Sequence, residues 1–261
     1  RIKITLKKWL VKNNNFYVLI FGFSLLSSLT IAQEEFDFDI EYQDEEKMTF
    51  NSTRIISGHS VETLPEKTFE MRIEHRFGDI SGDEGGHQTL FGFDNVADMR
   101  IALEYGITDK LMIGFGRCKG TSAPYSSLLD GFIKYRVMTQ NEGGAPLSIS
   151  VGAGSTFTYR EASSDMSVVA HFPKVSHRFC YYSQLNLAYR FGDALSLSLM
   201  PTLVHRNYVA QNDVNELFSL GTAFRLKLSK KLFLLMEYYH CFHDADFRQE
   251  KFFNSLGIAI E

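Results

Sequence analysis

The chain has 261 residues, with 27 Lys or Arg against 31 Asp or Glu, so its formal net charge is −4. Nucleic acid is therefore excluded as a natural partner, because phosphate binding demands a basic surface. After residue 32 no apolar stretch approaches the roughly 20 residues that a spanning helix needs. Any passage through a membrane would have to be made by a closed β-barrel.

Residues 1–32 have the pattern of a secretory signal peptide. Basic residues fill the start of the chain, the apolar run FYVLIFGFSLL (16–26) follows, and small or polar residues lead to Ala32. This apolar run is shorter than the roughly 20 residues of a membrane anchor, so cleavage after Ala32 is the favoured interpretation. The leader holds five of the basic residues and none of the acidic ones, which leaves a net charge of −9 on the rest of the chain.

Residues 33–67 form an acidic N-terminal segment ahead of the main domain. EEFDFDIEYQDEE (34–46) alternates acidic with aromatic or aliphatic residues, and MTFNSTRIISGHSVETLPEKT (48–68) is richer in Ile, Val, Thr and Ser. An acidic arm of the first kind is often disordered. The segment could be a periplasmic tail, a plug in a lumen or a surface strand, and we expect order more often in its second half.

The domain at 68–261 consists of strands joined alternately by short and long polar connections. Period-two alternation of apolar and polar residues, typical of a sheet with two unlike faces, recurs along it. We predict ten strands, at 68–77, 98–106, 111–117, 129–138, 147–159, 179–191, 195–205, 217–228, 232–240 and 252–261.

The small residues on one strand face distinguish two architectures. In LMIGFGR (111–117), Leu111, Ile113 and Phe115 share one face, and Gly114 and Gly116 share the other. In a soluble β-sandwich the apolar face would be buried between sheets, whereas in a membrane barrel it meets lipid and the other face lines the lumen. Glycine weakens a water-facing strand. The sequence therefore favours an all-β, antiparallel, up-and-down transmembrane β-barrel.

Charged residues also occupy the predicted lumen face. They can neutralise one another in a low-dielectric interior, where an unpaired charge is costly. Their role is to stabilise the barrel or to line a narrow or gated conduit, since wide aqueous pores need about 16 strands. The predicted lumen charge network comprises Glu70, Arg72, Glu74, Arg76, Arg100, Glu104, Lys134 and Arg136.

The run from Thr49 to Gly120 carries a family resemblance. It contains TFNSTRIISGHSVETL, FEMRIEHRFGDISGDEGG and LFGFDNVADMRIALEYGITDKLMIGFGRCKG. This run resembles a family of Gram-negative outer-membrane β-barrel proteins that is classed as a domain of unknown function. The resemblance implies a barrel without an assigned activity, supplies no catalytic residues, and suggests that the complete barrel could have twelve strands.

Two loops contain residue types that bind metal ions, but the spacing of these residues matches no defined metal site. One is the region of His240, His243 and Asp244, which offers imidazole and carboxylate groups for zinc or copper. The other is GDISGDEGGHQ (78–88), in which Asp79, Asp83 and Glu84 offer oxygen ligands for calcium but lack the full EF-hand spacing. We expect ordinary external loops at both places, with no cofactor.

The predicted function is that of a non-enzymatic protein of the Gram-negative outer membrane. Short turns would face the periplasm and long loops the outside. The protein would be a narrow transport or channel component or a structural one. Alternatives are a binding or scaffold protein, acting through its external loops or residues 33–67, and a secreted soluble β-sandwich. The expected partners are outer-membrane lipid and a periplasmic or surface protein.

Overall fold

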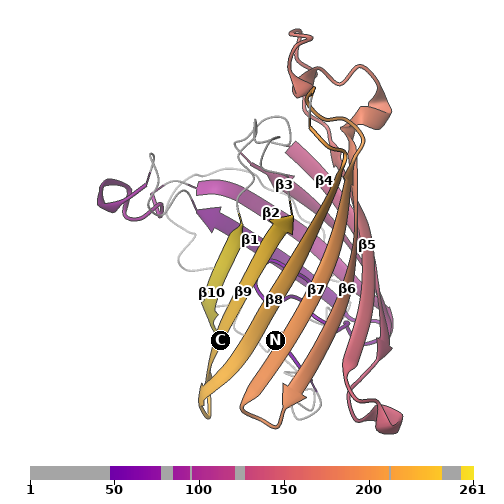
Figure 1. The fold of residues 1–261 in the computed structure, drawn as a ribbon, viewed down its shortest axis with the longest axis vertical. Coiled ribbons are helices and arrows are strands. Elements are labelled where there is room, and N and C mark those ends of the chain that lie inside the picture. The colour runs from indigo at the N-terminus through magenta and orange to yellow at the C-terminus, as the bar shows by residue number, and fades with distance from the viewer. Residues whose placement is uncertain (1–47, 78–84, 95, 121–126, 212, 243–253) are drawn as a thin grey trace, which may run out of the picture. The chain divides into compact units, whose positions relative to one another are not determined.

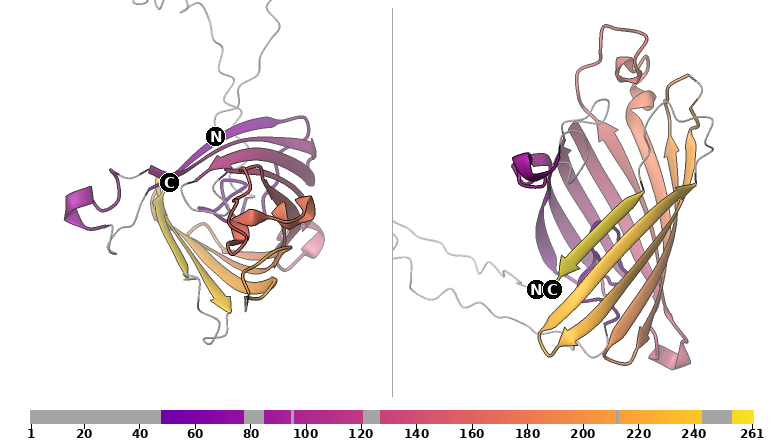
Figure 2. Two further views of the ribbon diagram at one scale, coloured as in Figure 1. Left: turned by 90° about the horizontal axis from the view of Figure 1, so that it is seen from above. Right: turned by 60° about the vertical axis from the view of Figure 1, so that its left-hand side comes forward.

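Ten strands in one antiparallel sheet make up the domain. The structure is a computed structural model, and it describes residues 48–77, 85–94, 96–120, 127–211, 213–242 and 254–261. Each strand pairs with the next in chain order, and the sheet curls around an interior (Figure 1; Figure 2). The strands are β1 Phe69–Phe77, β2 Val96–Thr108, β3 Leu111–Lys119, β4 Ser127–Met138, β5 Ser148–Thr158, β6 Phe179–Phe191, β7 Leu195–Arg206, β8 Glu216–Ser229, β9 Leu232–Phe242 and β10 Ser255–Ile260.

The predicted all-β, up-and-down architecture is confirmed, with each strand within three residues of its predicted bounds. In the described parts of the connections, the helical elements are short 3₁₀ turns, at η1 His87–Thr89, η2 Glu142–Gly144, η3 Val169–His171 and η4 Val175–Arg178. Within the described residues no helix is long and apolar enough to cross a membrane. The predicted leader at 1–32 and the acidic run at 34–46 lie outside the described residues.

The apolar strand face points outward. Met71 of β1, Leu103 of β2 and Phe115 of β3 are 63, 54 and 59% exposed, whereas Glu104 and Met112, on the opposite parity, are fully buried. A β-sandwich would bury the first set between two sheets. The sandwich interpretation is therefore wrong for this chain.

Glycines on the inward face make room for aromatic rings. Gly114 of β3 pairs across strands with Phe132 of β4, and a Cβ on Gly114 would lie 2.1 Å from the Phe132 ring. Gly154 stands in the same relation to Tyr182 of β6, at 2.4 Å. Each ring thus occupies the space that a side chain at the neighbouring glycine would fill.

Residues 48–65, here named the insert, lie inside the curled sheet. The connections after β2, β4, β6 and β8 meet at one end of the sheet, here named the short-turn end because those after β2, β6 and β8 have only two or three residues. Both arms of the insert are attached there: Arg190 donates to the Met48 carbonyl (3.2 Å), and Thr63 Oγ1 donates to the Asp109 carbonyl (2.6 Å). The insert therefore enters and leaves the interior at the short-turn end.

The exit of the insert provides a stability test at Gly106. The Lys67 amide donates to the Gly106 carbonyl (2.8 Å), and a Cβ on Gly106 would lie 2.0 Å from the Pro65 carbonyl oxygen. Because the obstructing atom is backbone, Gly106→Ala should destabilise the domain by about 1–3 kcal/mol, the range of overpacked sites. Thermal unfolding in detergent measures this. Gly131→Ala is the matched control, since its nearest contact would be an ordinary 3.7 Å; equal losses in both variants would contradict the prediction.

Candidate functional site

The insert is a tight hairpin-like loop with few backbone–backbone hydrogen bonds of its own. Arg54 and His59 form an isolated antiparallel bridge. The Ser60 amide donates to the Thr53 carbonyl and the Ile55 amide to the Gly58 carbonyl, both at 3.0 Å. The remaining polar groups of its backbone need partners elsewhere, because a buried N–H or C=O without one is costly.

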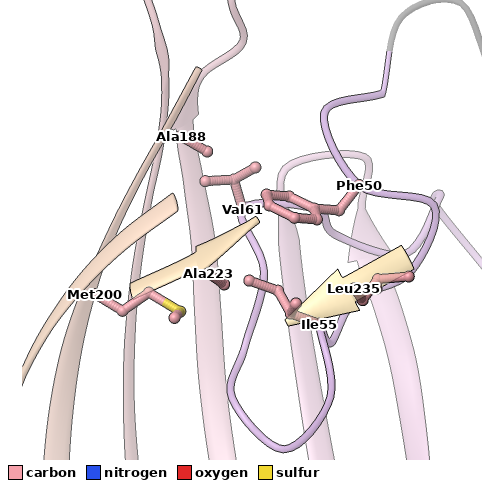
Figure 3. Close-up of a cluster of buried hydrophobic side chains, with 7 residues drawn as sticks. All are labelled: Phe50, Ile55, Val61, Ala188, Met200, Ala223 and Leu235. Atoms are coloured by element: carbon pink, nitrogen blue, oxygen red, sulfur yellow. The ribbon is translucent and has the colours of Figure 1, made fainter. Parts of the chain in front are cut away.

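One side of the insert is apolar. Phe50, Ile55 and Val61 pack in one buried cluster with small or flexible residues of the facing wall, and the side chains converge in Figure 3. That wall is formed by Ala188 of β6, Met200 of β7, Ala223 of β8 and Leu235 of β9. These four wall residues present an apolar surface, and the insert meets it with aliphatic and aromatic groups.

The tip of the insert is held by one carboxylate. Glu237 of β9, 2% exposed, accepts hydrogen bonds from the backbone amides of Ile56, Ser57 and Gly58 at 3.1–3.2 Å. Gly58 is required by close approach, since a Cβ there would lie 2.1 Å from the Tyr239 hydroxyl. Three amides around one carboxylate form an anion nest of the kind that turns provide. The amides of the insert thus satisfy the Glu237 carboxylate, and the carboxylate in turn satisfies the backbone N–H groups at the tip of the insert.

The other side of the insert is polar and meets a charged wall built from β1, β2 and β4. Lys134 is completely buried, and its ammonium donates to the carbonyls of Thr53 (2.9 Å) and Ser60 (3.3 Å). Glu104 accepts from the Thr53 hydroxyl (3.2 Å) and lies 3.6 Å from the Arg54 guanidinium. A lysine that would otherwise be an uncompensated buried charge is here satisfied by backbone of the insert.

The root of the insert is joined by a second buried carboxylate. Glu62 accepts from the amides of Thr49 (2.8 Å) and Phe50 (3.3 Å) and lies 3.4 Å from the Arg136 guanidinium. It therefore ties both arms of the insert to β4. A polar pocket of about 690 Å³ lies at this root and is lined by Met48, Glu62, Arg136, Thr139, Gln140, Asn141, Glu142, Arg190, Gly192 and Asp193.

His59 closes the insert against the aromatic part of the wall. Its Nε2 is 3.1 Å from the Tyr182 hydroxyl, and its ring centroid is 4.5 Å from that of Phe132. Burial, together with the positive charge of Arg54, Lys134 and nearby arginines, lowers the pKa of His59 well below its usual range. The imidazole is thus neutral, and it adds no charge to the lumen.

Seven of the eight residues of the predicted lumen network lie on the inner face and contact the insert or one another. Arg72 donates to the Thr53 hydroxyl (3.0 Å) and pairs with Glu70; Arg100 lies 3.4 Å from Glu74. Arg76 is the eighth, and its side chain is outside the described part of the structure. The seven residues are Glu70, Arg72, Glu74, Arg100, Glu104, Lys134 and Arg136.

Sequence reasoning missed the charges that complete this network. Asp130 forms a bidentate pair with Arg100 at 2.6 and 3.0 Å, and the insert contributes Arg54 and Glu62. Glu237 was overlooked because its strand is apolar on both parities. The sequence offered one signal for it: Glu237 is the single carboxylate of that strand, and a charge among apolar neighbours needs a specific partner.

The predicted metal ligands do not form a site in the described residues. His240 lies on the exposed face of β9, with its ring 4.7 Å from that of Phe242. His243, Asp244, Asp79, Asp83 and Glu84 are outside the residues that the structure describes. Across the described ranges, no three His, Cys, Asp or Glu side chains gather as a metal site.

An up-and-down sheet with an apolar exterior and a polar, occupied interior defines a membrane β-barrel. The comparison with protein families agrees: the model of a membrane-bound β-barrel domain of unknown function, DUF5777, matches residues 50–261. The chain belongs to this family, as the resemblance of residues 49–120 predicted. The match begins inside the insert. A search of curated proteins finds no match to the chain.

Removal of the Glu237 charge should loosen the tip of the insert. A charge-assisted hydrogen bond contributes about 1.5–3 kcal/mol, and Glu237→Gln replaces an acceptor of three amides with a group that is half donor. The backbone amides of 56–58 should then exchange with deuterium roughly 10- to 100-fold faster, as measured by mass spectrometry. Glu216→Gln, at a 75% exposed rim carboxylate, is the control and should leave their exchange unchanged. Equal rates in wild type and Glu237→Gln would contradict the assigned role.

Proposed function

We propose that the protein is a non-enzymatic barrel of the Gram-negative outer membrane that forms a narrow conduit closed by its own insert. The observation that carries the proposal is the position of residues 48–65 in the lumen, hydrogen-bonded to Glu237, Lys134 and Glu104. A segment that enters and leaves at one end can be withdrawn at that end without unthreading the barrel. In the resting state it fills the passage.

The charges of the wall support a conduit for small polar or ionic solutes. Arg54 and Glu62 of the insert lie 3.6 and 3.4 Å from Glu104 and Arg136 of the wall. When the insert leaves, these wall charges face an open passage, where they would attract ions and water. A barrel of about ten strands is narrow, so a wide diffusion pore is not expected.

A second candidate is a closed anchor or scaffold that meets a periplasmic or surface protein. The contacts that hold the insert at tip, root and both sides favour it, because a permanently filled barrel only needs to be stable. Its partner would be recognised by residues 33–67 or by the long loops. The two candidates differ in whether the insert ever leaves the lumen.

The localisation proposal is tested by fractionation of Gram-negative cells that produce the full chain. We expect a leader-cleaved protein in the outer-membrane fraction that is extracted only by detergent. Its gel mobility should change on boiling, because a barrel resists unfolding by detergent at room temperature. Recovery as a detergent-free soluble protein or from the inner membrane would reject an outer-membrane location.

The conduit proposal is tested by conductance in planar bilayers. The full chain should conduct rarely, and a variant in which Thr63 directly follows residue 33 should conduct at least about tenfold more often, since deleting residues 34–62 removes most of the insert from the lumen and leaves a passage lined by charges that bind water. The Glu237→Gln variant should conduct more often than the full chain and less often than the deletion variant. The boiling-dependent mobility shift shows that each variant is folded. A folded deletion variant without conductance above background would reject the conduit and favour the scaffold.

A further inference from the structure

An ordered, apolar knob lies in the long connection between β1 and β2. In residues 85–94, the Phe91 amide donates to the Gly86 carbonyl (2.8 Å), and the amides of Gly92 and Asp94 donate to the Thr89 carbonyl (3.0 and 3.3 Å). The backbone is thus a compact turn that satisfies its own hydrogen bonds.

The knob presents its apolar side chains outward. Leu90, Phe91 and Phe93 are 59, 55 and 60% exposed. Leu90 and Phe91 also have left-handed backbone conformations, with φ of 47° and 55°. Large side chains rarely adopt this conformation, and it persists where the surrounding structure imposes it, often at binding sites. Exposing three large apolar groups at the cost of such strain requires a contact that offsets it.

The knob continues the outward apolar belt of the barrel. The ring centroid of Phe93 is 5.0 Å from that of Phe77, the last residue of β1. Phe77 is exposed, and on the same strand Ile73 and Met71 are exposed on the outer face. Both views of Figure 2 show the knob, which contains η1, extending sideways from the barrel, and the right-hand view shows it toward the end opposite the short-turn end. It therefore projects over the area that surrounds the barrel rather than over its mouth.

We propose that Leu90, Phe91 and Phe93 dock into the lipid interface beside the barrel, as a lateral foot. The chain belongs to a membrane-bound family, and the belt that the knob continues is the surface that meets acyl chains. Aromatic and aliphatic groups on a polar backbone are suited to the boundary between headgroups and acyl chains. The foot would fix the height and tilt of β1 and β2 in the bilayer. This inference is independent of whether the lumen conducts.

A single-tryptophan experiment tests the foot directly. The chain has one Trp, at position 9, so a Trp9→Phe background lets one introduced Trp report alone. Phe91→Trp reports on the knob. Phe115→Trp reports on the belt of β3, and Met166→Trp reports on the β5–β6 connection, where Met166 is 78% exposed. Each protein is reconstituted in vesicles of phosphatidylcholine with or without brominated acyl chains, and the emission is recorded.

We expect brominated lipid to quench Phe91→Trp to at least half the extent seen for Phe115→Trp, with a blue-shifted emission. Met166→Trp should be neither shifted nor quenched. An unquenched, water-like Phe91→Trp would overturn the proposal. A blue-shifted but unquenched signal would also overturn it, since protein rather than lipid would then cover the knob. Phe93→Trp repeats the measurement should Phe91→Trp fail the boiling-mobility test for folding.

Discussion

The structure depends on the need of an irregular segment to find hydrogen-bond partners inside a barrel. Few hydrogen bonds join the backbone of the insert to itself, so its own side chains and those of the wall supply the rest. The Lys134 ammonium donates to two of its carbonyls, and Glu237 accepts from the amides of its tip. The insert's own Glu62 joins its two arms to β4. Lys134 and Glu237 are buried in the wall, and each would be costly without the insert. Wall and insert therefore stabilise each other.

The lumen has two unlike walls, and the insert has two matching sides. β1, β2 and β4 contribute carboxylates and cations such as Glu104 and Arg72, which face the polar side of the insert. The strands from β6 to β9 contribute Ala188, Met200 and Ala223, which face Phe50, Ile55 and Val61. This division fixes the rotation of the insert about its own axis, because a turned insert would place Arg54 against the apolar wall.

The way in which the charges of the wall are neutralised bears on both candidate functions. Charges of the wall are partly neutralised within the wall, as in the Arg100–Asp130 pair, and partly by the insert, as in the contacts of Arg54 and Glu62. Displacing the insert would remove these contacts from Glu104 and Arg136, so the filled state is favoured and an opening event needs an input of free energy. A conduit with these properties is closed at rest. A scaffold with these properties is rigid.

The sequence by itself determined the strands, their two faces and the charged residues of β1, β2 and β4. Period-two alternation is a local property, and glycine opposite Leu111, Ile113 and Phe115 already indicated a thin inner wall. Only the tertiary structure decided what fills the interior. The pairing of Glu237 with the tip of the insert spans about 180 positions of the chain, and no local pattern encodes a contact of that separation. The insert itself has no strand or helix period, because its conformation is set by the walls that enclose it.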